Sequence, residues 1–394
     1  MKAIKLIYKI GPGPSSSHTL AIKNVCEQFL NTYNNIDSIT VSLYGSLSLT
    51  GKGHFTDKII YKTFKNIKCN ILFKLDWEYE YSNGLIIEAI INNEVVKWVI
   101  FSLGGGDYKI LNHQDDKFKI VYPHSNFDQI KDYIKTNNIS IIQYINKFEP
   151  DLFDYLDIIF KQMINTIDNG LNQEGLLLGD LNIKRIAKQL NKKGINNKDN
   201  KIKLMSYAYS ANEENACCNI CVTAPTLGAS GVVSSIIYHL YKDLNYSKDI
   251  LIQGLAISGL FANIVKENAT ISGASGGCMA EVGVACSMGS ALLAYVNGLT
   301  LNQIEYAAEM GIEHHLGLTC DPIKGYVIIP CIERNALASL RSFDNYLLSK
   351  YSYDIKANLV SFDVVVKTMN YTANKLVKEL KETSLGGLAK EFYC

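Results

Sequence analysis

Four cysteines stand where a thiolate could reach a metal centre. Cys278 follows a glycine pair, Cys320 precedes an Asp-Pro pair and Cys331 follows a proline, so these three are predicted at turns rather than on apolar helix faces. Glycine and proline interrupt regular backbone hydrogen bonding, which lets thiolates and nearby N–H groups point at one spot. Cys394, the last residue of the sequence, is the fourth candidate. Four converging thiolates would suit an iron–sulfur cluster or structural zinc.

The spacing of these cysteines leaves two interpretations open. They are 42, 11 and 63 positions apart, and no interval matches the paired C-x-x-C of a zinc ribbon. Buried free cysteines are the alternative, because such thiols are common in apolar cores. Cys218 and Cys221 form a C-x-x-C, which by itself suggests redox or metal chemistry. We interpret that pair as structural, because the cluster ligands are expected elsewhere.

A serine-rich run precedes the amphipathic helix predicted over residues 21–33. The run G-P-G-P-S-S-S-H-T occupies residues 11–19. Serines ahead of a helix are good N-caps, and the first helical N–H groups carry a partial positive charge. Capping is therefore one interpretation of the run. An anion site for a substrate carboxylate is the other.

A second histidine, His54, ends the loop G-K-G-H. A histidine beside glycines can approach a ligand closely, and its ordinary pKa suits proton transfer near neutral pH. The alternative is an exposed loop histidine. Lys52 in the same loop could form a Schiff base with pyridoxal phosphate, but no other part of a pyridoxal-enzyme signature accompanies it. We therefore discount that chemistry.

From residue 11 to the C-terminus the sequence resembles the iron–sulfur-dependent L-serine dehydratases, also called L-serine ammonia-lyases. The matching stretches occur in the family's order. Around the cysteines they are G-C-M-A-E-V-G-V-A-C-S-M, E-H-H-L-G-L-T-C-D-P and P-C-I-E-R-N-A. Elsewhere they are G-P-G-P-S-S-S-H-T, Y-G-S-L-S-L-T-G-K-G-H-F-T-D, S-L-G-G-G, N-E-E-N-A-C-C-N-I-C-V-T-A-P-T-L-G-A-S-G and E-T-S-L-G-G-L-A. Several motifs in one order are far more specific than any single motif.

The resemblance implies a [4Fe-4S] cluster as cofactor and the deamination of L-serine to pyruvate and ammonia by dehydration. Cys278, Cys320 and Cys331 would hold the cluster permanently. Cys394 would cap the fourth iron at rest, and the substrate would displace this tail. An iron without a cysteine ligand can act as a Lewis acid toward the substrate hydroxyl.

The resemblance also assigns roles to polar residues. His54 is the first choice for the base that removes the Cα proton, and His18 is the second. The serines would orient the substrate carboxylate. The expected substrate-binding residues are Ser15, Ser16, Ser17, Thr19, Gly105 and Thr226. The expected partners are a small amino acid and a second copy of the chain, in a homodimer.

Five positions inside the motifs depart from the family's usual residues: Leu227, Ser275, Met279, His315 and Ile328. Four of these changes replace polar or charged groups by apolar or smaller ones. Sites that read polar groups depend on pairing them, so substrate choice could change. A pocket enlarged by Ser275 and lined by Leu227 and Ile328 would favour threonine, or a less polar or β-substituted amino acid. A non-catalytic iron–sulfur or zinc protein is the third interpretation, against which the retained His18 and His54 argue.

Hydrophobic periodicity predicts an α+β N-terminal domain followed by an all-α catalytic domain. We place these at residues 1–149 and 150–394, and the resemblance implies that they are similar to the beta and alpha parts of serine dehydratases. Residues 191–200, N-K-K-G-I-N-N-K-D-N, are predicted to be a surface loop. The predicted strands are Lys5–Lys9, Ile39–Leu47, Asn70–Glu80, Leu85–Ile91 and Glu94–Phe101.

Composition excludes some classes of function. The chain has 394 residues, 47% of them hydrophobic and 20% charged, with a net charge of +1. This charge gives no electrostatic argument for nucleic acid or membrane as a partner. The most apolar run, residues 250–265, contains Gln and Asn and is predicted to be a buried helix. With ten cysteines and no expected secretory signal, reduced thiols in the cytoplasm are predicted.

Overall fold

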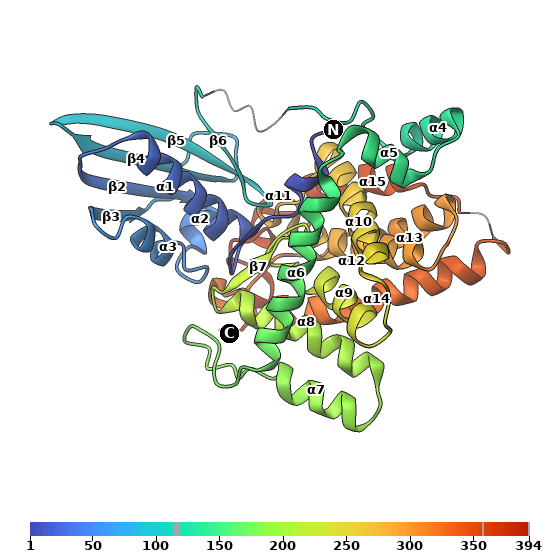
Figure 1. Ribbon diagram of the computed structural model, residues 1–394. Coiled ribbons are helices and arrows are strands. Elements are labelled where there is room, and N and C mark those ends of the chain that lie inside the picture. Colours follow the sequence, from blue (N-terminus) through green and yellow to red (C-terminus); the bar gives the residue numbers. More distant parts are fainter. Residues whose placement is uncertain (114–118, 357, 393–394) are drawn as a thin grey trace.

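An α/β part built on one sheet adjoins a larger helical part (Figure 1). The structure, a computed structural model, describes residues 1–113, 119–356 and 358–392. Strands dominate the chain between residues 36 and 110, and helices dominate from residue 127 onward. The predicted fold class, an α+β region followed by an all-helical one, is therefore confirmed.

The sheet has five strands in the order β3-β2-β4-β5-β6. The strands are β2 (Ile36–Gly45), β3 (Lys68–Phe73), β4 (Asn83–Ile91), β5 (Glu94–Gly104) and β6 (Asp107–Ile110). The β2–β3 pair is parallel and the other pairs are antiparallel. Alternate residues of β2 and β4 point into a core that helices α1 (Ala21–Thr32) and α3 (Thr56–Thr63) cover. Period-two alternation of this kind is what a sheet with one buried face requires.

Sequence patterns located the central strands better than the outer ones. The β4–β5 hairpin was predicted, and Asn92 and Asn93 in its turn both have positive φ, as a tight hairpin turn requires. The prediction of a strand at Lys5–Lys9 is wrong. Residues Ile4–Leu6 form a short 3-10 helix, because Ile4 and Ile7 pack into the helical core instead of a sheet. The strand predicted over Asn70–Glu80 ends at Phe73.

The helical part contains thirteen α-helices among the described residues. They are α4 (Phe127–Asn137), α5 (Ile141–Phe148), α6 (Leu152–Leu171), α7 (Ala187–Asn196), α8 (Asn200–Ala216), α9 (Ser230–Lys242), α10 (Lys248–Asn268), α11 (Gly273–Gly276), α12 (Val282–Val296), α13 (Leu301–Glu313), α14 (Cys331–Ser352), α15 (Phe362–Lys375) and α16 (Gly387–Glu391). The loop predicted at 191–200 is wrong for most of its length. Gly194 packs against Lys203, which draws this polar segment into an α7–α8 helical hairpin.

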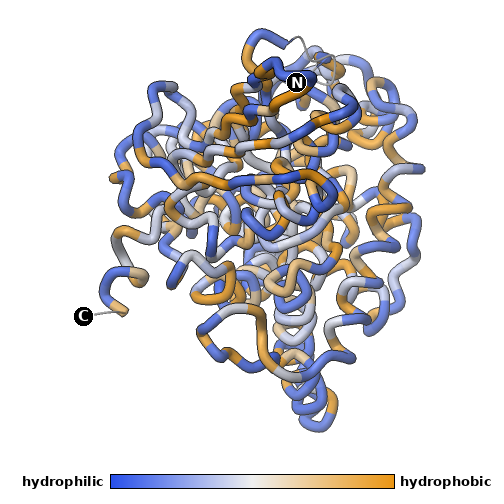
Figure 2. The backbone as a smooth tube through the Cα atoms, turned by 90° about the vertical axis from the view of Figure 1, so that its left-hand side faces the viewer, coloured by the Kyte–Doolittle hydropathy of each residue, from blue (hydrophilic) through white to orange (hydrophobic). Residues whose placement is uncertain are grey.

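Helices α10 and α12 form the centre of the helical core. Every residue of α12 from Val282 to Ala294 is buried. Helix α10 is long and apolar enough to cross a membrane, but 78% of its apolar window is buried in the structure, as in a core helix. The prediction of a buried helix here is confirmed. Other helices bury one face, so hydrophilic and hydrophobic residues alternate along most of the chain (Figure 2).

The first twenty residues join the two parts. Tyr8 lies in the helical core, and its hydroxyl donates to the Leu255 carbonyl over 2.8 Å. Strand β1 (Ile10–Pro12) then pairs antiparallel with β7 (Ile220–Val222). The serine-rich run that follows is thereby held where the sheet meets the helices. The domain boundary near residue 149 stays a prediction; α4 and α5, which precede it, pack into the helical core.

The close contact of α12 and α13 gives a stability prediction. A Cβ at Gly311 would lie 2.5 Å from the Ser287 Cα, a backbone atom that cannot move aside. We expect Gly311→Ala to lower the free energy of unfolding by about 1–3 kcal/mol, because overpacking a core displaces backbone. Chemical denaturation measures this. Asn302→Ala, at an exposed position of the same helix, is the control and should change little; equal effects would contradict the packing argument.

Candidate active site

His18 is fully buried in a polar nest made by the serine-rich run and the end of β2. Ser15 caps the short helical segment Ser16–Leu20 by accepting from the His18 backbone N–H. The His18 Nδ1 lies 3.0 Å from the Ser17 hydroxyl, and its Nε2 lies 3.2 Å from the Ser46 carbonyl. Because a carbonyl only accepts, Nε2 carries the hydrogen and Nδ1 accepts from Ser17. The serine run therefore both caps the helical segment and positions the His18 ring.

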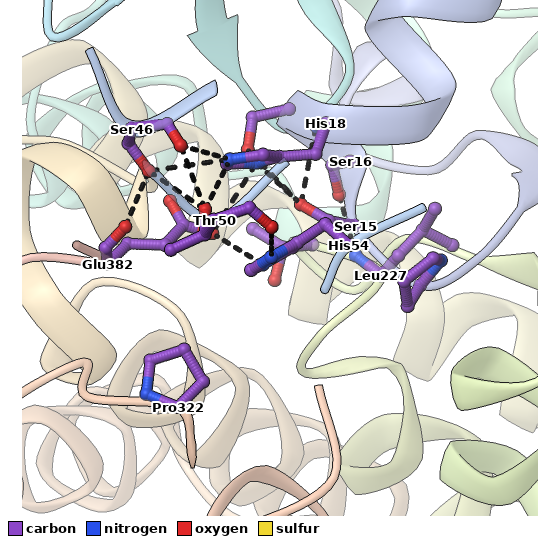
Figure 3. A network of polar contacts seen from close by, with 12 residues as sticks. Ser15, Ser16, His18, Ser46, Thr50, His54, Leu227, Pro322 and Glu382 are labelled. Carbon is purple, nitrogen blue, oxygen red and sulfur yellow. Dashed lines mark hydrogen bonds and ion pairs between the residues drawn. The ribbon is translucent and has the colours of Figure 1, made fainter. Parts of the chain in front are cut away.

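His54 stacks on His18 (Figure 3). Their ring centroids are 4.1 Å apart with an interplanar angle of 24°. The His54 Nδ1 lies 3.1 Å from the Thr50 carbonyl, so this nitrogen donates. In the neutral ring Nε2 is then the free acceptor, and it faces the Glu382 carboxylate at 3.4 Å. The arrangement leaves His54 with one nitrogen able to take a proton.

Glu382 connects the histidines to the cysteine region. Its Oε1 is 3.4 Å from His54 Nε2 and 3.7 Å from His18 Nδ1. Its backbone N–H donates to the Cys320 carbonyl over 2.7 Å, and its carbonyl accepts from the Ser46 hydroxyl over 2.6 Å. Glu382 is not among the site residues predicted from the sequence. It is the first residue of the matched E-T-S-L-G-G-L-A motif, and that was the available signal.

Burial and the proximity of other ionisable groups shift the pKa values of His18 and Glu382. Burial, followed by the proximity of His54, lowers the pKa of His18 to about 4. Burial alone would raise the pKa of Glu382, but the two imidazoles outweigh it and hold that pKa below its usual value. At neutral pH His18 is therefore neutral and Glu382 is ionised.

Three of the four predicted cysteines come together beside this group. Cys278 lies in a 3-10 turn, Cys320 follows the end of α13, and Cys331 begins α14. All three are buried and line one small cavity, together with Ser15, His54, Glu281 and Glu382. The Sγ atoms of Cys278 and Cys320 and a carboxylate oxygen of Glu281 lie within 4.8 Å of one another. Cys394 lies outside the described residues.

The donor set fits a thiolate-bound metal centre. Contact with Cys320, and the nearby Arg334 guanidinium, lower the pKa of Cys278, although burial opposes this. Arg334 also donates to the Thr319 carbonyl over 2.6 Å and pairs with Asp321 at 3.3 Å, which fixes the loop that carries Cys320. Soft, buried thiolates select iron–sulfur clusters or zinc over hard cations. The chemistry of these residues therefore suits the expected cluster.

The predicted substrate-binding residues divide into two groups. Ser15 lines the cavity, Ser17 contacts His18, and Thr226 lies beside Glu281. The other three residues, Ser16, Thr19 and Gly105, make hydrogen bonds within the protein that hold the chain in place. Ser16 accepts from the Leu227 N–H, Thr19 donates to the Pro12 carbonyl, and Gly105 accepts from Lys9 through its carbonyl.

None of the five departures from the family pattern lines the cavity. Leu227 packs with Leu20 and Cys221, and Ile328 packs in a separate apolar cluster, so the prediction that these two line the pocket is wrong. Met279 is buried in the main core, and Ser275 and His315 border other cavities. The physical reason is that each replacement completes apolar packing or faces outward. The argument for a less polar substrate thereby loses its support.

A buried carboxylate–imidazole pair next to grouped thiols can transfer a proton and is typical of an enzyme active site. Comparisons with known proteins identify the family. Residues 82–389 match the model of the serine dehydratase alpha chain, and residues 3–71 match that of the serine dehydratase beta chain. The chain belongs to the serine dehydratase family, whose members are carbon–nitrogen lyases.

Curated relatives match along the whole chain. The L-serine dehydratase of Helicobacter pylori strain 26695 is 34% identical, over 100% of this chain and 99% of the relative. L-serine dehydratase 1 of Escherichia coli K12 is 34% identical over 98% of both chains. The L-serine dehydratase of Haemophilus influenzae is 31% identical over 98% of both. Both parts of the chain are therefore shared with these relatives.

The neutral state of His18 gives a prediction on pH. Its pKa of about 4 lies below the usual unfolded value, so the unfolded chain binds an extra proton between these two pKa values. The contribution of neutral His18 to stability is therefore fully present above the pKa that this histidine has in the unfolded chain, and it is lost as pH falls below that value. From pH 7 to pH 5 this histidine should cost about 2 kcal/mol of unfolding free energy. Denaturation of the wild type and of His18→Gln at both pH values measures it; equal losses would contradict the assignment.

Proposed function

We propose that this chain deaminates L-serine to pyruvate and ammonia by dehydration, with a [4Fe-4S] cluster held by Cys278, Cys320 and Cys331. The observation that carries the proposal is the single cavity that joins these thiols to the His54–Glu382 pair. When bound, the cluster supplies a Lewis acid for the departing hydroxyl. The proposal keeps Cys394 as its resting cap, and it includes a homodimer in the cytoplasm.

The residues of the chain would divide the proton chemistry between them. His54, neutral and with Nδ1 donating to the Thr50 carbonyl, would take the Cα proton at Nε2. Glu382, 3.4 Å from that nitrogen, would stabilise the imidazolium that forms. His18, with its lowered pKa, stays neutral and supports the His54 ring by stacking, which makes it the weaker candidate for the base.

After the Cα–H and Cβ–O bonds break, the remaining steps need no further group from the protein. The enamine tautomerises to an imine, which water hydrolyses to pyruvate and ammonia. Ser15 and Ser17 hydroxyls next to His18 are the groups available to orient a carboxylate at this end of the site. The names of the full-length relatives support serine as the substrate.

The first test is the reaction itself. Protein reconstituted with iron and sulfide without oxygen should release pyruvate and ammonia from L-serine, and air should abolish this activity because it destroys an exposed cluster. Coupled assays of both products measure it. A protein with an intact cluster but no pyruvate would contradict serine as the substrate, and a panel that includes threonine would then identify another amino acid.

The ligand set has its own test. Cys320→Ala should lose the cluster, measured as iron and sulfide content and visible absorbance, together with activity. Cys286→Ala is the matched control, since Cys286 is equally buried but bonds Ser342 and Asn345 in the core; it should keep both. Cys394→Ala should keep most of the cluster. If it loses the cluster as completely as Cys320→Ala, the displaceable cap is wrong.

A further inference from the structure

Two carboxyl groups, from Glu281 and Glu382, converge on one point of the cavity. A Cβ at Gly273 would lie 2.7 Å from Glu281 Oε2 and 3.4 Å from Glu382 Cδ. Both side chains line the cavity that contains His54 and the three cysteines. Because residue 273 is a glycine, no side chain separates the two carboxyl groups from each other at this point.

Glu281 has no ion pair among the described residues, and Glu382 faces the two histidines through only one of its oxygens. The Glu382 Oε2 is buried and has no side-chain partner, Oε1 faces the histidines, and the Ala274 backbone also bonds this carboxyl group. For Glu281 the described part of the chain offers the Thr226 hydroxyl but no ion pair. Two carboxyl groups this close repel each other when both are ionised, and a cation between them would remove that repulsion.

Glu281 lies between the cysteine thiols and the His54–Glu382 pair. Its carboxylate oxygen is within 4.8 Å of the Cys278 and Cys320 thiols, and its neighbour Glu382 is 3.4 Å from the base nitrogen of His54. A serine with its Cα–H at His54 and its hydroxyl toward the thiols has two remaining polar substituents, a carboxylate and an ammonium group. The proposed function orients the carboxylate at Ser15 and Ser17, which leaves the ammonium group for the two acids. That group is the cation the two acids lack.

We propose that Glu281, together with Glu382 Oε2, binds the α-ammonium group of the substrate and makes the site selective for amino acids over hydroxy acids. This inference rests on the proposed function, from which the orientation of the substrate is taken. An ammonium group between the two carboxyl groups would donate hydrogen bonds to both of them. The Thr226 hydroxyl, which bonds Glu281, would orient the Glu281 carboxylate toward the ammonium group.

The experiment compares ligands that differ only in the ammonium group. L-alanine and propionate are suitable because neither carries a hydroxyl to eliminate. Calorimetry on the reconstituted wild type should show tighter binding of L-alanine. In Glu281→Gln, the affinity for L-alanine should fall by roughly tenfold or more, because a charge-assisted hydrogen bond is lost. The affinity for propionate should not change. For L-serine as substrate, the KM of Glu281→Gln should rise by a similar factor.

A matched control separates this role from a structural one. Glu309 is also buried, with an unpartnered Oε1 and a pKa raised to about 8 by burial, but it lies on α13 outside the cavity. Glu309→Gln should leave the ratio of L-alanine to propionate affinity unchanged. Equal weakening of both ligands in Glu281→Gln would overturn the inference, as would loss of iron, which would make Glu281 a cluster ligand.

The outcomes distinguish the inference from the proposed function. If the wild type releases no pyruvate from L-serine but still prefers L-alanine through Glu281, the reaction fails and the ammonium site stands. If pyruvate is released and Glu281→Gln keeps the full preference for L-alanine, the reaction stands and the ammonium site is wrong.

Discussion

The site depends on a buried carboxylate held against two stacked imidazoles. A lone ionised carboxylate in the interior would cost several kcal/mol. Glu382 faces His18 and His54 through Oε1, and their proximity, together with a hydrogen bond from the Ala274 backbone, holds its pKa below the usual value. The same residue is fixed through its backbone, by Ser46 on one side and Cys320 on the other. One electrostatic contact therefore aligns the proton-transfer group with the thiols.

This contact works only if the sheet and the helical part keep a fixed relation. His54 follows β2, whereas Cys320 and Glu382 belong to the helical part, more than 250 positions later. The β1–β7 pair holds the serine run between them. Asp107 on β6 adds a buried bridge, pairing with Lys9 and with Lys266 of α10. Largely buried charges of this kind add little net stability, because the cost of removing them from water offsets their attraction.

Local physical rules explain which elements the sequence predicted. Ser247 and Thr300 cap α10 and α13, and the Asn92-Asn93 pair makes the turn between the two predicted strands β4 and β5. Such features depend on neighbours within a few residues, so a sequence pattern contains them. Failures occurred where tertiary packing overrode the pattern. The Lys5–Lys9 segment reads as a strand, yet its apolar residues are used by the helical core.

By itself the sequence determined the family and the fold class, because motifs and periodicity carry that information along the chain. It also singled out as candidates the three cysteines and His54 that the structure places around one cavity. Only the tertiary structure decided that Glu382 serves the histidines, that Glu281 approaches it, and that Leu227 and Ile328 lie away from the cavity. The physical reason is distance along the chain. A charge pair between residues 54 and 382 leaves no trace in local spacing, and it exists only once the sheet and helices have packed together.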